Sequence, residues 1–326
     1  MTAPGVLLRP TRRPEFGVAP ILAERGLGDS RLALGVAGLG GAWGPVDEGE
    51  SLATLLHALE QGVCAFDSAP SYVAGEKLLG RALAQWRGPR PVISTKAGRL
   101  PARDAHEGLS DFSPAGMRDG VQRSLALLGL AQVDLLFLHE PQLVPAAERP
   151  RVVDTLRQLQ AEGLTRRLGL GGGEGEGWDG FVETGAFEVA MLFRRLDPCI
   201  FDGLATDLPR VRRAGMVTYG ASPLHMGLLG ARYGQFVRER PAWVWGPQID
   251  RAIRLQALAE KNHLLLATLA HRFTFGLAEI DRVVIGASNR TELDAALADF
   301  AAGPLPVDLF TEICGIVDGC TGGPPA

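Results

Sequence analysis

The feature that most constrains this chain is a strict alternation of short apolar runs with segments of helical periodicity. Several of the runs are apolar without interruption, which is typical of parallel strands buried on both faces. Eight strands alternating with helices predict an α/β fold, a (β/α)8 TIM barrel. The predicted strands cover residues 32–38, 63–66, 91–95, 133–139, 166–171, 188–193, 215–220 and 282–287.

The segments between these runs carry signals for helix ends. Ser113 is a predicted N-cap, with Pro114 at the first helical position. Asn289 is followed three residues later by Glu292, which is the spacing of a capping box. The predicted helices include residues 48–62, 113–129, 151–163 and 289–300.

A doubly wound open sheet is the alternative architecture for the same alternation. The stretch "GLGGAWG" after the first run does not have the glycine spacing of a Rossmann turn. We therefore expect the 326 residues to form a single barrel domain. Residues 1–30 would be an N-terminal extension over the barrel bottom, and residues 221–250 would be a long irregular loop after strand seven that shapes the pocket.

Composition and charge argue against several classes of function. The chain is 46% hydrophobic and 21% charged, with a net charge of −4, and it has no lysine- and arginine-rich block, so no nucleic-acid partner is expected. No apolar run approaches the roughly 18 residues of a membrane span, and the N-terminus lacks the apolar region of a signal peptide, so we expect a cytoplasmic protein without a membrane partner. Cys64, Cys199, Cys314 and Cys320 form no CxxC pair and no cluster with histidines, so no metal site is expected.

Three consecutive predicted strands end in polar residues. These are Asp67, Lys96 and His139, and Tyr72 follows in the loop after strand two. The C-terminal ends of neighbouring barrel strands share the catalytic face. Taken singly, a strand-end aspartate usually caps a turn, a lysine is usually solvated, and a histidine in an apolar run is usually a core residue. Together the four residues predict a catalytic site.

The combination suits the reduction of a carbonyl group or the reverse oxidation. A phenol with a pKa of about 10 is a poor acid–base group at neutral pH. The Lys96 ammonium would stabilise the phenolate of Tyr72 and lower that pKa. Asp67 would keep Lys96 charged and oriented, and His139 would hydrogen-bond the substrate oxygen.

The stretches "FDSAPSYVAGEKLLGRAL", "ISTKAG" and "VDLLFLHEP" occur in this order, and with them the chain resembles the aldo-keto reductase superfamily from about residue 31 to residue 300. The resemblance implies a barrel that binds NAD or NADP without a Rossmann domain. It also implies a catalytic tetrad of Asp67, Tyr72, Lys96 and His139.

Further stretches, "ASPLHMGLLG", "PAWVWGP" and "VVIGASNRTELDAAL", resemble the branch that contains L-galactose dehydrogenase and D-threo-aldose (L-fucose) 1-dehydrogenase. This resemblance implies oxidation of the anomeric hydroxyl of a free sugar to a lactone. We expect Trp43, just after strand one, on the substrate wall. The expected cofactor contacts are Gly171, Gly172, Met191, Ser222, Leu224, Gly286, Ser288, Asn289 and Glu292.

The chain departs from the family pattern at three places. Val73 stands where a glycine usually follows the tyrosine, Gly171–Gly173 replace a Ser-Asn pair, and Met191 falls near a frequent glutamine. A glycine backbone permits close approach to a cofactor, but side-chain hydrogen bonds to the nicotinamide carboxamide are lost. A catalytically weak protein that senses or binds the cofactor is therefore the alternative function. A metal-dependent barrel hydrolase is disfavoured, because "GVAGLGG" after strand one contains no HxH.

The choice between NAD and NADP depends on Glu292. NADP-specific relatives usually carry an arginine here, whereas a carboxylate would repel a 2′-phosphate and accept a ribose hydroxyl, so NAD is favoured. Two alternatives stay open: Glu292 completes a capping box with Asn289, or Arg290 binds the phosphate. We expect a small-molecule substrate, a carbonyl compound or sugar, and a monomer or small homo-oligomer.

Overall fold

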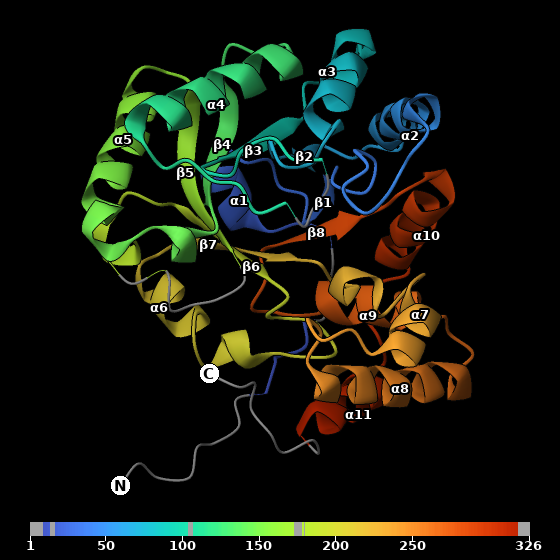
Figure 1. Cartoon of the computed structure of the whole chain (residues 1–326). Helices are drawn as coiled ribbons and strands as arrows, with labels where there is room; N and C mark the ends of the chain where they lie inside the picture. Colours follow the sequence, from blue (N-terminus) through green and yellow to red (C-terminus); the bar gives the residue numbers. More distant parts are fainter. Residues whose placement is uncertain (1–8, 14–16, 104–106, 173–177, 179, 319–326) are drawn as a thin grey trace, which may run out of the picture.

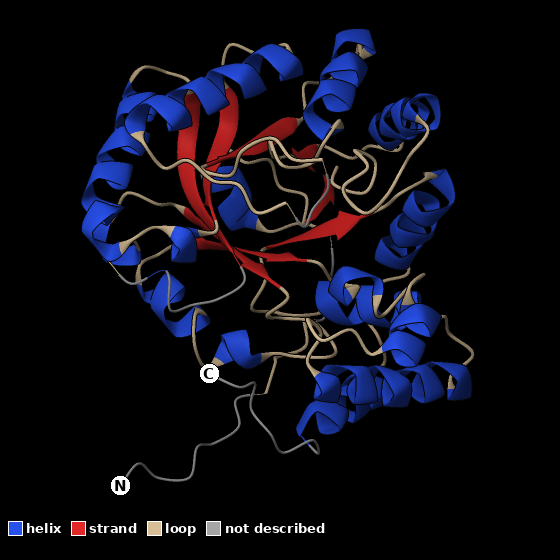
Figure 2. Ribbon diagram, viewed as in Figure 1, coloured by secondary structure: helices blue, strands red, loops and turns tan. Residues whose placement is uncertain are grey.

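The computed structural model describes residues 9–13, 17–103, 107–172, 178 and 180–318. Within these residues, eight parallel strands form a closed barrel in the order β1 to β8 (Figures 1 and 2). The predicted (β/α)8 barrel is confirmed. The strands are β1 (Leu32–Gly35), β2 (Ala65–Asp67), β3 (Val92–Ala97), β4 (Val133–His139), β5 (Thr165–Gly172), β6 (Val189–Phe193), β7 (Val217–Ala221) and β8 (Arg282–Gly286).

Helices surround the barrel on its outside, as Figure 2 shows. The predicted helix ends are confirmed, because the Ser113 hydroxyl accepts from the Gly116 amide at 3.1 Å and Asn289 Oδ1 accepts from the Glu292 amide at 2.9 Å. No helix in the described parts of the chain has the length and apolarity that a membrane span requires. The helices are α1 (Pro20–Glu24), α2 (Glu48–Glu60), α3 (Gly75–Gln85), α4 (Pro114–Leu128), α5 (Arg149–Ala161), α6 (Leu208–Arg213), α7 (Tyr233–Glu239), α8 (Gly246–Lys261), α9 (Leu266–Phe275), α10 (Arg290–Ala301) and α11 (Val307–Asp318).

The N-terminal segment that carries α1 closes one end of the barrel. Leu22 and Leu27 are fully buried and pack with inward-facing residues of the strands, and Figure 1 shows α1 within the ring of strands. The buried guanidinium of Arg282 donates to the carbonyl oxygens of Ser30 and Leu27 and to the Tyr219 hydroxyl, at 2.9, 2.7 and 2.7 Å. The opposite end, where the strands terminate, is left for a binding site.

Residues 221–250 are partly helical, so the prediction of a long irregular loop is wrong for this segment. They contain a 3-10 turn, η6 (His225–Gly227), then α7 and the start of α8. A helix as short as α7 is not stable by its own propensity. It is held by packing, since Phe236 is buried and meets the Trp243 ring edge-on at 5.4 Å. Such tertiary contacts leave no periodic signal in a segment of this length.

Candidate active site

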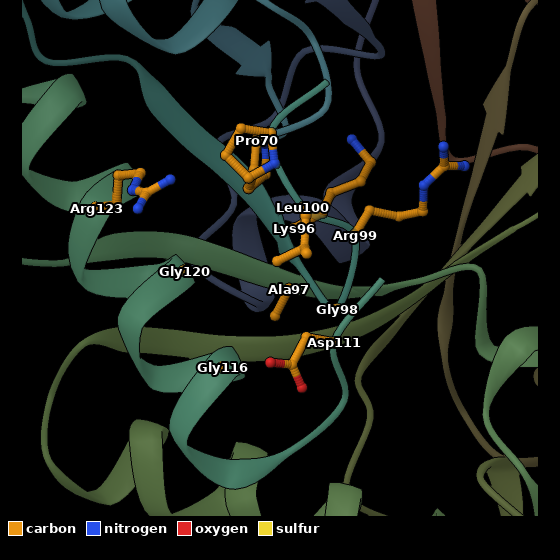
Figure 3. Close-up of a pocket in the computed structure, with 11 residues that line it drawn as sticks. Pro70, Lys96, Ala97, Gly98, Arg99, Leu100, Asp111, Gly116, Gly120 and Arg123 are labelled. Atoms are coloured by element: carbon orange, nitrogen blue, oxygen red, sulfur yellow. The ribbon is translucent and has the colours of Figure 1, made fainter. Parts of the chain in front are cut away.

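A cavity of about 580 Å³ lies at the C-terminal ends of the barrel strands, within the size range of small-molecule sites. Each strand contributes at least one lining residue. A second space, of about 10 Å³ between β3 and α4 (Figure 3), has room for about one water molecule. The large cavity is lined by these residues from the sequence prediction: Trp43, Asp67, Tyr72, Lys96, His139, Gly171, Gly172, Met191, Ser222, Leu224, Gly286, Ser288 and Glu292. Asn289 is not among its lining residues.

Asp67 and Lys96 form a buried ion pair at the cavity floor. Lys96 Nζ donates to Asp67 Oδ2 at 2.5 Å and to the Ser68 carbonyl oxygen at 2.9 Å. Asp67 Oδ1 accepts from the Ser94 hydroxyl at 2.8 Å. Burial acts to lower the pKa of Lys96, but Asp67 and Tyr72 outweigh it and raise that pKa above its ordinary value. Lys96 is therefore a fixed positive charge.

Tyr72 lies beside this charge, with Lys96 Nζ 4.8 Å from the centre of its ring. Burial raises the pKa of the phenol above its ordinary value, although the Lys96 charge acts in the opposite direction. The predicted effect of Lys96 is present, but loss of hydration and the nearby carboxylates of Asp67 and Glu140 outweigh it. Tyr72 is therefore a protonated phenol at neutral pH.

His139 completes the group. Its ring meets the Tyr72 ring edge-on, with the centroids 6.3 Å apart. Burial lowers the pKa of His139 well below its ordinary value, and the charges of Lys96 and Arg99 add to this effect. Its Nδ1 atom has no hydrogen-bond partner among the described residues. The structure thus brings the four predicted residues together, with a neutral histidine beside a protonated tyrosine.

The ion pair of Arg99 and Glu140 is one feature of the cavity that the sequence analysis missed. Arg99, after β3, donates through Nη1 to Glu140 Oε2 and through Nη2 to the Glu107 carbonyl oxygen, the latter at 2.7 Å. Both Arg99 and Glu140 line the large cavity. The available clue was their place in the sequence, because Glu140 directly follows His139 and Arg99 closely follows Lys96. From the sequence alone, however, such charged residues cannot be told from ordinary solvated ones.

The glycines after β1 support the tyrosine loop. A Cβ atom at Gly40 would come within 2.2 Å of the Tyr72 carbonyl oxygen and 2.6 Å of the Gly75 amide nitrogen. One at Gly38 would lie 2.5 Å from the Ala287 carbonyl oxygen. These glycines therefore serve the close packing of three loops at the rim. Val73 has a φ of 53°, in the left-handed region that favours glycine.

The end of β5 carries the two glycines at which the sequence suggested nicotinamide contacts. A Cβ atom at Gly171 would lie 3.5 Å from Phe137, an ordinary contact, whereas one at Gly172 would come within 2.9 Å of Gln142 Oε1. Gly171 pairs with His139 on one side and with Met191 on the other, so it lies at the level of the catalytic group. Gly173 falls outside the described residues. Across the cavity, the Ser222 hydroxyl accepts from the Met226 amide at 3.0 Å.

The N-terminus of α10 lies at the far side of the cavity. Glu292 Oε2 accepts from the Ser288 amide at 2.8 Å, while the Glu292 amide donates to Asn289. The capping interaction is therefore present, with the carboxylate on the amide of Ser288. Arg290 is exposed and is not among the cavity-lining residues. At this helix end the cavity is therefore lined by the Glu292 carboxylate and not by the Arg290 guanidinium.

Asp197, Cys199 and His225 form a buried cluster with possible ligand atoms within 4.8 Å of one another. His225 Nδ1 lies 2.7 Å from Asp197 Oδ2, and its Nε2 lies 3.1 Å from Gln248 Oε1. Both ring nitrogens therefore already have partners. The cluster is a hydrogen-bonded link between the loops after β6 and β7.

Comparison with known proteins gives a consistent result. The family model described as "Aldo/keto reductase family" matches residues 31–318. D-threo-aldose 1-dehydrogenase of a Pseudomonas species is 28% identical over 328 residues, covering 90% of this chain and 96% of that protein. L-galactose dehydrogenase of Arabidopsis thaliana is 27% identical over 314 residues, covering 91% and 93%. The structure of a glycerol dehydrogenase from Gluconobacter oxydans shares the fold, with a TM-score of 0.74, 22% identity, and coverage of 96% and 98%.

Proposed function

Since this chain belongs to the aldo/keto reductase family of NAD(P)-dependent enzymes, we propose that it transfers a hydride between a nicotinamide cofactor and a sugar or small aldehyde. Oxidation of an aldose C1 hydroxyl to a lactone is the reaction we favour. One observation carries the proposal: Tyr72, His139 and the buried ion pair of Asp67 and Lys96 meet in one cavity.

The residues at the cavity fit a dinucleotide. One cavity is lined by His139 of the catalytic group, by Gly171, which has no side chain, and by Glu292 at the N-terminus of α10. The nicotinamide supplies or accepts the hydride when bound. We assign Gly171, Gly172 and Met191 to its ring, Ser222 and Leu224 to the middle of the cofactor, and Gly286, Ser288 and Glu292 to the adenosine half. Asn289 acts only as the helix cap.

The protonation states of Tyr72 and His139 determine which group donates the proton. In reduction, the protonated phenol of Tyr72 donates to the carbonyl oxygen, while neutral His139 hydrogen-bonds the same oxygen. Lys96, held by Asp67, stabilises the phenolate that remains. In oxidation the phenolate removes the hydroxyl proton. Trp43 and Trp243 are 41% and 45% exposed and line the cavity, so they offer apolar faces to a substrate.

NAD is the cofactor that the adenosine end favours. The Glu292 carboxylate already accepts from the Ser288 amide, so it occupies the helix end that would otherwise bind a phosphate. A 2′-phosphate would have to displace it and meet its negative charge. A ribose 2′-hydroxyl can donate to the same carboxylate.

A catalytically weak, cofactor-binding protein is the second candidate. It is favoured by the glycines at 171 and 172, which offer no side-chain donor or acceptor to the carboxamide. Both candidates bind the nicotinamide cofactor, but only the enzyme turns over a substrate.

The test is a titration of the purified protein with NAD(H) and NADP(H), followed by tryptophan fluorescence quenching, and then a screen of aldoses and small aldehydes for cofactor turnover. Tight binding of NAD(H) with turnover supports the enzyme. Binding without turnover supports the second candidate, and no binding of either cofactor contradicts both.

A further inference from the structure

We propose that Glu140, held by Arg99, accepts a hydrogen bond from the hydroxyl group on the carbon next to the reacting carbon. The site would then select 2-hydroxyaldehydes, aldoses among them, over simple aldehydes. This inference rests on the proposed oxidoreductase function and adds a specificity-determining residue to it.

The backbone at Glu140 is unusual and places its side chain. Glu140 has a φ of 53° and a ψ of 65°, in the left-handed region. A residue other than glycine rarely keeps this conformation unless its surroundings hold it there, and such residues cluster at ligand sites. Its amide donates to the Gly171 carbonyl oxygen at 2.7 Å. The chain therefore turns sharply after His139, and Glu140 lines the cavity.

Arg99 fixes the carboxylate. The Arg99 side chain is 10% exposed and that of Glu140 is 30% exposed. In Figure 3 the side chain of Arg99 points away from Asp111 and Arg123 of the neighbouring small pocket. Arg99 engages only Oε2 of Glu140, and no hydrogen bond to Oε1 occurs within the described residues. One carboxylate oxygen is thus held by the arginine, and the other is available to a ligand.

Arg99 and Glu140 line the same cavity as Tyr72 and His139. Burial is the main cause of the raised pKa of Tyr72, and the Glu140 carboxylate adds to it. Burial is likewise the main cause of the lowered pKa of His139, and the Arg99 charge adds to it. Such effects decline with distance. Since Tyr72 and His139 bind the reacting oxygen, a residue adjacent to His139 is placed to meet a substituent on the next carbon.

The chemistry favours a hydroxyl group. A carboxylate accepts from a hydroxyl in a charge-assisted hydrogen bond, which is stronger than a neutral one. A substrate that lacks the hydroxyl would strip water from the carboxylate without replacing it, and sites built around such a bond reject the analogue that lacks the hydroxyl. Because Glu140 is partly exposed, we expect discrimination on the order of 10- to 100-fold, below the largest values for fully enclosed sites.

The experiment compares lactaldehyde with propanal, two aldehydes of equal chain length that differ in the hydroxyl at C2. The measured quantity is the ratio of their kcat/KM values with saturating reduced cofactor, in the unaltered protein and in Glu140→Leu and Glu140→Gln. The matched control is Glu162→Gln, which alters a carboxylate paired with Arg118 on the outer helices, away from the cavity.

The unaltered protein and Glu162→Gln should prefer lactaldehyde by the same factor. Glu140→Leu should bring the ratio close to one, mainly through a higher KM for lactaldehyde, and Glu140→Gln should keep part of the preference because its amide oxygen still accepts. An unaltered protein without preference, or a ratio that Glu140→Leu leaves in place, overturns the inference alone. Failure of the unaltered protein to reduce either aldehyde, together with failure to oxidise or reduce any aldose, overturns the proposed function with it.

Discussion

Lys96 Nζ lies 4.8 Å from the centre of the Tyr72 ring while it donates to Asp67 at 2.5 Å. The lysine charge is therefore divided between a carboxylate and a phenol. Burial raises the pKa of Tyr72, so the phenol keeps its proton at neutral pH, and the charge of Lys96 acts in the opposite direction and stabilises the phenolate when it forms.

The pH dependence of activity should follow from this arrangement. Reduction needs the protonated phenol, whose pKa is raised above about 10, so its rate should stay level through the neutral range and fall only as pH rises through that high pKa. Oxidation needs the phenolate, so its rate should rise with pH over the same range. The pKa of His139 is lowered, so no break should occur near pH 6.5.

The measurement is kcat/KM against pH in both directions on one substrate pair. A reduction rate that falls between about pH 7 and pH 9, well below the ordinary phenol pKa, would contradict the assigned state of Tyr72. A break near about pH 6.5 that disappears in His139→Asn would contradict the assigned state of the histidine.

The barrel was predictable because buried parallel strands leave uninterrupted apolar runs. The same logic located Asp67, Lys96 and His139, since each lies at or next to the end of its strand and barrel strands end on one face. Tyr72 was then the aromatic acid–base group of the adjoining loop.

What the sequence could not show depends on three-dimensional surroundings. The direction in which the pKa of Tyr72 shifts depends on how much water the folded site excludes. The role of Glu140 depends on a left-handed backbone conformation, and α7 depends on the packing of Phe236. None of these properties is a pattern of residue types along the chain.

Val73 offers a test of backbone strain at the catalytic loop. It is 42% exposed, is branched at Cβ and has a φ of 53°, so Val73→Gly should raise the free energy of unfolding by about 1 kcal/mol. The freedom that glycine adds to the unfolded chain offsets part of the gain. The measurement is the urea midpoint. Val307→Gly is the control, since that exposed valine begins α11 without a positive φ, and it should lower stability. An equal decrease in the free energy of unfolding in both variants would show that the backbone at Val73 is not strained.

Glu292 tests the cofactor assignment. Glu292→Arg should shift the ratio of the dissociation constants for NAD and NADP toward NADP by about 10- to 100-fold, because hydrogen bonds to charged groups contribute about 1.5–3 kcal/mol. Glu292→Gln, which removes the charge at equal size, should shift the ratio less. Fluorescence titration gives both constants. The same ratio in all three proteins would mean that Glu292 only caps α10.

The account depends above all on Tyr72 as the group that moves the proton. The most direct measurement is single-turnover hydride transfer in Tyr72→Phe, with the cofactor dissociation constant measured on the same sample. The account predicts a rate lower by about 10²- to 10⁴-fold with cofactor affinity changed by less than about twofold, since the phenol oxygen is the only atom removed. A transfer rate equal to that of the unaltered protein would show that another group supplies the proton, and the proposed mechanism would be wrong.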